Sequence, residues 1–567
     1  MAAGAVTAAP AGAPAVPGGA PAAPAGTPAA GWRPLLALWA GGTAAVALTG
    51  LVLWWTGTPG WDLAAHLYKT WLLREGYSVF WDTYWYGGSY GAITYGVVYY
   101  LLAVVIPWPV LVVFSAGALP PLFFLYYRAA WGVEEIWPAV ILAGVMCMYL
   151  SHGQDPFLLA LALTLGAMAL TVRGRPLWGA ILAGVGVFTN PLALIVGGVF
   201  LVADFAARPA LRRRLLLFAA GLAPFVVARL LVGLVFAEPG WYLDQLLQAV
   251  LYVSFAVVGV TLALVNEAHP RRPFVWLFVI YGAVVLGTTL VPGSPLGSNV
   301  GRFFMVFAFS VLFFLRRDRF RRPFGSRWLP WALLPVLGFA GLQMSTPVSH
   351  YFTAREELPA TTREFWAPAL AAAARYDDPD HRLHVVAPRR HFEAWYLPEA
   401  GHPITRGWYR QADALHNRIF YTSYGPEQYV TWLRSMGVEY ILLPDDPLDP
   451  WSRREPGILA RSPAFELVEE TGDWEVYRLR DAEGLVQPLD GGAGRVVEYD
   501  HLSLRVQVDR PGRYLVKVTS TPFWRLEGVP GRLAATRGRF VVLHAEEAGV
   551  ATLRFDFDWG VAARQLF

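Results

Sequence analysis

The stretch Pro34–Thr56, PLLALWAGGTAAVALTGLVLWWT, is followed within a few residues by the polar passage Gly60-Trp61-Asp62-Leu63-Ala64-Ala65-His66. The first part carries no charge and is long enough to cross a bilayer as a helix, which takes about 20 apolar residues. The second part places a carboxylate where that helix meets water. This order of segments predicts a membrane protein with a polar site at the mouth of its first helix.

The composition of the whole chain supports a membrane protein. Of 567 residues, 55% are hydrophobic and only 16% are charged, and the mean hydropathy is +0.39. These values exclude a soluble globular protein and indicate a polytopic α-helical membrane protein. The single cysteine, Cys147, rules out an intramolecular disulfide. The net charge of +4 comes from arginines in short loops between apolar spans, so membrane topology explains it better than a nucleic-acid partner.

Arginine-bearing loops define the expected topology, because positive residues favour the cytoplasmic side. These loops contain Arg128, Arg173 with Arg175, Arg208 with Arg212 to Arg214, Arg271 with Arg272, and the segment 316–322. Two apolar spans lie between successive marks, joined on the far side at Ser151–Pro156, Thr189–Pro191, Glu238–Asp244 and Pro292–Gly301. Residues 1–33, rich in Ala, Pro and Gly, are expected to form a disordered leader.

The long first outer loop, 57–108, contains one apolar stretch too many for this topology. Only one crossing fits between the first helix and Arg128, so we assign Val110–Tyr127 as the crossing and Tyr90–Ile106 as a helix in the outer interface. About eleven crossings result by the ~20-residue criterion, the last at Trp328–Met344. The transmembrane region is then 34–349, in the cytoplasmic membrane, with a cytoplasmic N-terminus and an extracytoplasmic C-terminal part.

That C-terminal part is expected to form two domains. In 350–485, a strand is predicted at Arg382–Ala387 and a helix at Glu427–Met436, which leads through Gly437 into a strand at Glu439–Leu443. This pattern is typical of an α/β domain. In 486–567, apolar and polar residues alternate in short segments between Gly and Pro turns, at 502–508, 514–518 and 551–557. This alternation predicts a β-sandwich.

Asp62 is the first candidate for catalysis. A helix that starts here places His66 on the same face as Asp62, and the carboxylate is then suited to take a proton from an attacking hydroxyl. The alternative is a carboxylate favoured by the helix dipole. Asp155 is a second outer acid near the membrane, with capping of the next helix as its alternative.

Arg302 is the basic candidate, because it follows a glycine-containing turn on the outer side, where arginine is disfavoured. A phosphate suits an arginine at a helix start, and snorkelling to lipid headgroups is the alternative. Asp82 is either a site residue or an ordinary loop residue. Aromatic residues such as Trp85 and Tyr86 present faces for sugar rings, although such residues are also common at membrane interfaces.

The order of these elements resembles the C superfamily of integral-membrane glycosyltransferases (GT-C). The segments Trp71–Gly76, Tyr84–Gly88 and Tyr95–Ala103 are similar to the YfhO-like and "6-pyruvoyl-tetrahydropterin synthase-related" membrane proteins within it. The later segments Trp524–Gly528 and Gly538–Leu543 resemble the C-terminal β-domain of the YfhO-like proteins. The resemblance spans most of the chain through short motifs.

The resemblance implies an inverting transferase that moves a sugar from a polyprenyl phosphate to a glycan, glycolipid or protein at the outer face. Asp62 and Asp155 would be catalytic, and Arg302 with Asn299 would bind the donor phosphate. The expected substrate-binding residues are His66, Asp82, Trp85, Tyr86, His152 and Gln154. A divalent cation stays open as a cofactor: many relatives pair two acids in the first loop, whereas Trp61 and Leu63 flank Asp62.

Two other classes of function stay open. A flippase for lipid-linked glycans would need a similar outer cavity, although the chain has neither an inverted repeat nor a clear charged residue in the middle of a span. A glycan-binding membrane protein without catalysis would use the β-sandwich alone. Asp62→Asn distinguishes the three, because only the transferase loses turnover directly.

Overall fold

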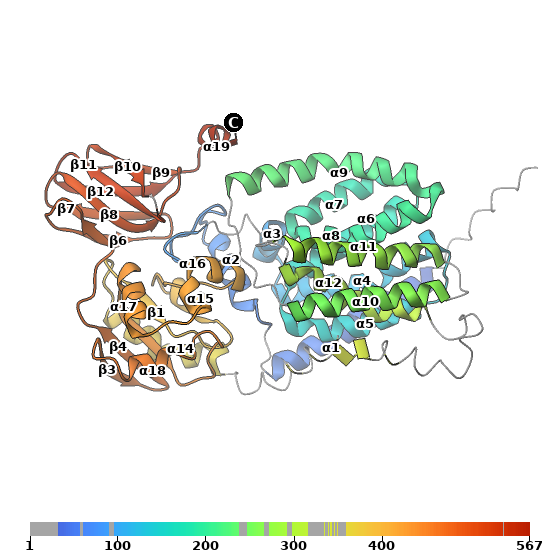
Figure 1. The fold of residues 1–567 in the computed structure, drawn as a ribbon, viewed down its shortest axis with the longest axis horizontal. Helices are drawn as coiled ribbons and strands as arrows, with labels where there is room; N and C mark the ends of the chain where they lie inside the picture. The colour runs from blue at the N-terminus through green and yellow to red at the C-terminus, as the bar shows by residue number, and fades with distance from the viewer. Residues whose placement is uncertain are drawn as a thin grey trace, which may run out of the picture.

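The computed structural model describes residues 32–56, 60–89, 96–236, 246–265, 271–291, 297–315, isolated positions between 334 and 349, 359–536 and 538–566. A bundle of apolar helices lies beside a globular part that contains all the strands described (Figure 1). The leader, the arginine segment 316–322, the loop Glu238–Asp244 and the expected last span Trp328–Met344 lie largely or wholly outside the described residues.

The apolar helices follow one another as the arginine loops predict. They are α1 (Trp32–Trp55), α4 (Trp108–Trp131), α5 (Trp137–Tyr149), α6 (Asp155–Val172), α7 (Pro176–Thr189), α8 (Pro191–Ala207), α9 (Pro209–Val235), α10 (Leu246–Val265), α11 (Arg271–Leu290) and α12 (Gly301–Phe313). Proline at the first or second position starts α6 to α9, where its missing N–H costs nothing.

Within the described residues, α1, α4, α6, α9 and α11 are long and apolar enough to cross a membrane, whereas α5, α7, α8, α12 and the stretch Gln248–Leu264 of α10 are shorter apolar helices. The protein is therefore an integral membrane protein, while the number of crossings and their direction stay predictions. α6 is largely buried within the bundle, whereas α9 exposes leucines such as Leu230 (62%) and Leu234 (68%). Leucines exposed in this way face lipid.

A buried carboxylate ties two of these helices together near the end that carries Arg208. Asp204 of α8 accepts hydrogen bonds from Tyr126 Oη at 2.6 Å and from Trp131 Nε1 at 3.0 Å, both on α4. An acid inside an apolar bundle is costly without such partners. Asp204 thus has a structural role that hydrophobic patterning did not reveal.

The first loop forms two short helices, α2 (Leu63–Arg74) and α3 (Val97–Val105). α3 has nine residues, too few to cross a bilayer, and it occupies part of the segment Tyr90–Ile106 that we expected in the interface. Residues 90–95 lie outside the described part. Figure 1 places α2 and α3 between the bundle and the globular part.

The first half of the globular part is an α/β unit. Its helices are α14 (Arg363–Arg375), α15 (Glu393–Glu399), α16 (Arg410–His416), α17 (Pro426–Ser435) and α18 (Glu455–Leu459). Its strands are β1 (Arg382–Val385), β2 (Val438–Pro444), β3 (Phe465–Thr471) and β4 (Trp474–Leu479), in the order β1-β2-β4-β3, with β1 and β2 parallel. The predicted first strand and the helix-Gly-strand unit are confirmed, and Gly437 at the turn has φ +70°.

The second half consists of two four-stranded antiparallel sheets around a shared apolar core. Their strands are β5 (Val486–Pro488), β6 (Gly494–Tyr499), β7 (Ser503–Val508), β8 (Gly512–Thr519), β9 (Trp524–Glu527), β10 (Gly531–Ala535), β11 (Phe540–Ala545) and β12 (Gly549–Phe555), before the C-terminal helix α19 (Trp559–Leu566). The sheet orders are β10-β11-β8-β5 and β6-β7-β12-β9. The three predicted strands are present as β7, β8 and β12.

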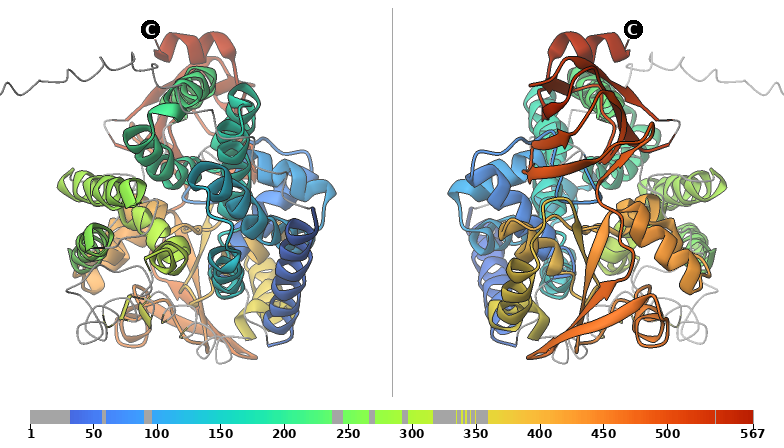
Figure 2. Two further views of the ribbon diagram at one scale, coloured as in Figure 1. Left: turned by 90° about the vertical axis from the view of Figure 1, so that its right-hand side faces the viewer. Right: turned by 90° about the vertical axis from the view of Figure 1, so that its left-hand side faces the viewer.

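The first loop holds the globular part against the bundle. Its backbone bonds to both halves: Ile404 N–H donates to Tyr84 O at 2.9 Å, and Thr519 N–H donates to Gly87 O at 2.7 Å. The end-on views in Figure 2 show the sheets lying over one end of the bundle. We call the end of the bundle that faces the globular part the globular end.

Candidate functional site

Two loops of the globular end touch backbone to backbone. A Cβ added at Gly60 would lie 2.0 Å from Gly153 Cα, and one added at Gly153 would lie 2.6 Å from Gly60 Cα. Gly153 also has φ +64°, which glycine adopts without strain. This contact brings together the loop that carries Asp62 and the loop that carries Asp155.

Asp62 stands at the N-cap of α2, but its side chain makes no capping hydrogen bond. Instead, Trp408 Nε1–H donates to Asp62 Oδ1 at 3.0 Å. Burial raises the pKa of Asp62 to about 6, against the opposing charges of Arg302, His391 and Arg410 and the Trp408 hydrogen bond. The carboxylate therefore does not act as a helix cap, and its pKa suits a group that exchanges protons near neutral pH.

Two cationic side chains of the α/β unit pack against the ring of Trp408. The His391 ring stacks on it with centroids 3.5 Å apart, and the Arg410 guanidinium lies 4.8 Å from its ring. Both groups bind Asp449: Arg410 through two hydrogen bonds of 3.0 and 2.5 Å, and His391 Nε2 at 3.2 Å. Asp449 thus fixes the indole that reaches Asp62.

The charges around Trp408 are consistent with this arrangement. Burial alone lowers the pKa of His391, but the carboxylates of Glu393 and Asp449 outweigh it and raise the pKa above its usual value. Burial alone raises the pKa of Asp449, but hydrogen bonds from His391 and Arg410 hold it well below its usual range. Asp449 is therefore ionised at neutral pH and anchors both cationic side chains.

Asp155 is buried at the first position of α6, where Gln154 rather than Asp155 is the N-cap. Tyr99 Oη of α3 donates to Asp155 Oδ2 at 3.3 Å, and the Asp62 charge acts on the same carboxyl. The structure therefore brings the two predicted acids close to each other, and neither carboxylate makes a capping hydrogen bond to its helix.

Arg302 lies at the start of α12. Together with Asp62 and Asp155 it forms a cluster of charged side chains. Its side chain is buried, its Nε donates to Asn299 Oδ1 at 3.1 Å, and its guanidinium lies 4.7 Å from the Phe157 ring of α6. Its charge also acts on Asp62. An arginine in these contacts is not snorkelling towards headgroups. It supplies positive charge near Asp62.

His66 connects the two loops. Its Nε2 lies 3.1 Å from Gly153 O and its Nδ1 lies 2.9 Å from Tyr100 Oη, which in turn lies 2.9 Å from Tyr409 Oη. Burial lowers the pKa of His66 to about 3, so the ring is neutral. Because a carbonyl only accepts, Nε2 carries the proton and Nδ1 accepts from Tyr100. Both ring nitrogens are thus engaged in positioning the loop.

Three predicted substrate-binding residues lie instead where the first loop meets the globular part. Asp82 accepts hydrogen bonds from Tyr68 Oη and faces His501 Nδ1, both at 2.9 Å, and Trp85 Nε1 donates to Ala394 O at 2.9 Å. Tyr86 stacks on His416 at 4.8 Å. All three are buried, so their faces are not open to a sugar ring in this structure.

The other two predicted residues of the second loop lie next to Asp155. His152 stacks on Tyr149 at 4.8 Å, and the hydroxyl of Tyr149 donates to the side-chain oxygen of Gln154. Gln154 is partly exposed. These two side chains therefore flank the cluster, and we keep them as candidates for substrate contact.

The α/β unit contributes residues to the site that sequence reasoning missed. They are His391, Trp408, Tyr409, Arg410 and Asp449. Trp408 is separated from Asp62 by more than half of the chain, so no local spacing connects them. The only visible signal was a concentration of Arg, His and aromatic residues in Arg389-Arg390-His391 and Gly407-Trp408-Tyr409-Arg410. Periodicity cannot place such runs.

One group among the described residues has the side chains of a metal site. Asp378, His381 and Glu439 present ligand atoms within 4.8 Å of one another. His381 Nδ1 lies 3.4 Å from Asp378 Oδ2 and 3.6 Å from Glu439 Oε2. Oxygen and imidazole ligands suit a divalent cation. Arg478 already binds Glu439 at 2.8 Å, so a cation there would compete with a guanidinium.

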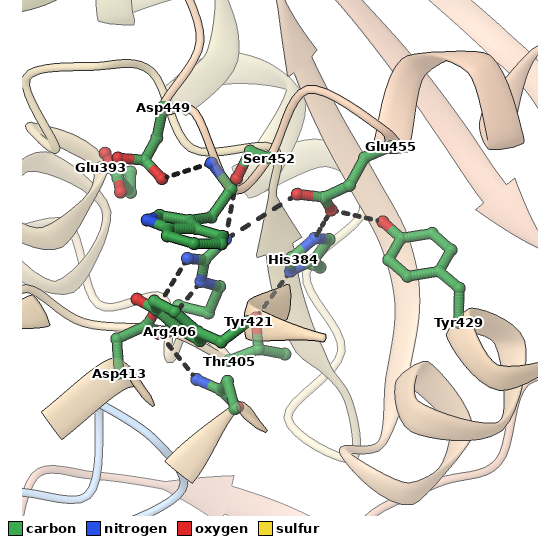
Figure 3. Close-up of polar contacts among 12 residues, drawn as sticks. His384, Glu393, Thr405, Arg406, Asp413, Tyr421, Tyr429, Asp449, Ser452 and Glu455 are labelled. Atoms are coloured by element: carbon green, nitrogen blue, oxygen red, sulfur yellow. Dashed lines mark hydrogen bonds and ion pairs between the residues drawn. The ribbon is translucent and has the colours of Figure 1, made fainter. Parts of the chain in front are cut away.

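A buried polar network supports α16, which begins with Arg410 (Figure 3). Arg406 donates to both oxygens of Asp413, at 3.0 and 2.6 Å, and to Ser452 Oγ at 2.8 Å. Tyr421 Oη also donates to Asp413, at 2.7 Å. The network therefore connects α16 to the core of the α/β unit, where Glu455 accepts from Tyr429 at 2.7 Å.

Replacing Arg406 by methionine is expected to destabilise the α/β unit by about 3–5 kcal/mol, because Asp413 would stay buried without its cation. Hydrogen exchange at the β1 and β2 amides measures the effect. Arg363→Met is the matched control, because Arg363 is 61% exposed in its ion pair with Glu399 and exposed pairs contribute little. Equal exchange in the two variants would contradict the structural role of Arg406.

Comparisons with known proteins give distant likenesses only. No family model and no curated protein matches the chain. Archaeal oligosaccharyltransferase AglB from Archaeoglobus fulgidus, solved with an inhibitory peptide and a dolichol-phosphate, is similar with TM-score 0.40 and 10% identity over 73% of this chain and 70% of that chain. ArnT from Cupriavidus metallidurans, in the apo state, is similar with TM-score 0.30 and 14% identity over 77% of this chain and 83% of that chain. These likenesses concern the overall fold at most and assign no activity, and the YfhO-like resemblance is not confirmed.

Proposed function

We propose that the protein is a membrane glycosyltransferase that moves a sugar from a polyprenyl-phosphate donor to a cell-envelope acceptor, with inversion at the anomeric carbon. The globular end then faces the outside of the cell. The observation that carries the proposal is the cluster of Asp62, Asp155 and Arg302. It joins an acid with a pKa of about 6 to a buried arginine at the membrane boundary.

In the proposed reaction, the acceptor hydroxyl gives its proton to Asp62 while its oxygen attacks the anomeric carbon. The bond from that carbon to the phosphate oxygen breaks, and polyprenyl phosphate leaves with the electron pair. Arg302, supported by Asn299, stabilises the charge that develops on the phosphate. In this proposal, Trp408 orients the base, and Asp155, close to Asp62, contacts the acceptor.

Release of polyprenyl phosphate tests the proposal. Purified protein in lipid is incubated with a panel of polyprenyl-phosphate sugars and an acceptor-rich membrane extract. Turnover of one donor, lost in Arg302→Ala, supports the transferase and identifies the sugar. Binding of a lipid-linked glycan without turnover of any donor would instead favour the flippase or the glycan-binding protein.

The pH profile provides a sharper prediction. Asp62 acts as a base only when ionised, so kcat/KM is expected to fall about tenfold per pH unit below about 6 and to level off above it. The Trp408 hydrogen bond lowers the pKa of Asp62, so Trp408→Phe moves the inflection to higher pH. Trp451→Phe, which alters an exposed indole of the same unit, leaves the inflection in place. An unchanged inflection in Trp408→Phe would refute the role of Asp62 as the titrating base.

A further inference from the structure

The C-terminal helix α19 packs on the end of a membrane-spanning helix. Ala562 is buried in one apolar cluster with Val235 and Phe236, which close α9, and Val561 and Leu566 pack against the same cluster. Phe236 also stacks on Phe80 of the first loop at 5.0 Å. The inner face of α19 is thus attached to the bundle itself, not only to the β-sandwich.

The end of α9 lies at the level of the lipid headgroups. With 27 residues, α9 is about 40 Å long, whereas the hydrocarbon core of a bilayer is about 30 Å thick. Its exposed Leu230 and Leu234 continue the lipid-facing surface almost to Val235. A helix packed on the last turn of α9 is therefore at the boundary between acyl chains and headgroups.

The outer face of α19 carries residues that are typical of proteins at such a boundary. Trp559 is 78% exposed, and Ala563, Arg564 and Gln565 are exposed as well. Tryptophan and arginine are the residues that prefer the interface, one by its amphipathic ring and the other by its long stem. Asp558 fixes the start of the helix, because its carboxylate accepts from Val561 N–H at 2.9 Å.

The position of α19 indicates which molecules contact its outer face. In Figures 1 and 2, α19 lies at the globular end of α9 and farther than α9 from the other helices of the bundle. We propose that α19 is an interfacial anchor whose outer face, with Trp559 and Arg564, binds the headgroup region of the surrounding phospholipid. The β-sandwich is then held on the membrane surface at a second point, beyond the first loop.

Site-specific fluorescence tests the anchor in the full-length protein. Because Cys147 is the single cysteine, Cys147→Ala provides a background in which Trp559→Cys takes one environment-sensitive label. The protein is reconstituted in phosphatidylcholine bilayers with and without a lipid that carries a nitroxide near its headgroup. Leu234→Cys on α9 is the lipid-facing control, and Leu467→Cys on β3, 44% exposed, is the water-facing control.

We expect lipid-borne nitroxide to quench the label at 559 several-fold more than the label at 467, approaching the quenching at 234. Aqueous iodide should rank the sites in the opposite order. Quenching at 559 equal to that at 467 by both agents would overturn the proposal. Arg564→Cys gives a second position should the first variant fold poorly. The measurement involves no turnover, so its outcome is independent of the proposed function.

Discussion

Asp62→Asn is expected to lower the rate of sugar transfer by a factor of about 10² to 10⁴, the usual contribution of a positioned general base. The amide has nearly the shape of the carboxylate, and its oxygen still accepts the Trp408 N–H bond. Donor affinity is therefore expected to stay close to that of the wild type. The measurement is polyprenyl phosphate released per unit time, together with binding of the donor that the panel identifies.

The control for this variant is Glu75→Gln. Glu75 is an exposed carboxylate at the C-cap of α2, the helix that begins beside Asp62. The Glu75→Gln variant removes one negative charge from the same helix as Asp62→Asn does. It therefore measures any general effect of losing that charge on folding or activity. Turnover by Asp62→Asn within a few-fold of the Glu75→Gln rate would exclude Asp62 as the base.

Gly153→Ala is expected to reduce activity by about 10² or more, because a displacement of about 1 Å at a catalytic group has that effect. The new Cβ would lie 2.6 Å from Gly60 Cα, so the two loops must separate. Asp62 and Asp155 move apart with them, and His66 loses its bond to Gly153 O. Activity and thermal stability of the same preparations are measured in parallel.

Two further variants separate the clash from backbone strain. Gly132 has φ +67°, close to the +64° of Gly153, but a Cβ there meets nothing within 4 Å. Gly132→Ala therefore adds the strain of a left-handed residue, about 1–2 kcal/mol, without moving the loops. Gly60→Ala adds the clash without a left-handed φ. Activity should fall in Gly60→Ala and persist in Gly132→Ala, and the reverse pattern would rule out loop contact as the cause.

The alternatives that sequence reasoning left open for single residues depend on where each side chain points. A carboxylate at a helix start is consistent with capping, and Asp62 and Asp155 were both compatible with it. Their observed partners are Trp408 and Tyr99. Asp82, Trp85 and Tyr86 show the opposite case: a polar, aromatic loop looked open to substrate, yet the globular part covers it. Exposure of a loop cannot be read from its composition when another part of the chain packs on it.

The sequence by itself determined the class of the protein, the order of its apolar helices and the main strands of its C-terminal part. These features follow from local hydrophobic periodicity and from positions of arginine, glycine and proline, which act over a few residues. It also identified Asp62, Asp155 and Arg302 individually. Only the tertiary structure decided that the three lie together, that Gly60 against Gly153 joins their loops, and that Trp408 and Asp449 complete the site. Those contacts arise from the packing of segments far apart in the chain, and no local pattern encodes them.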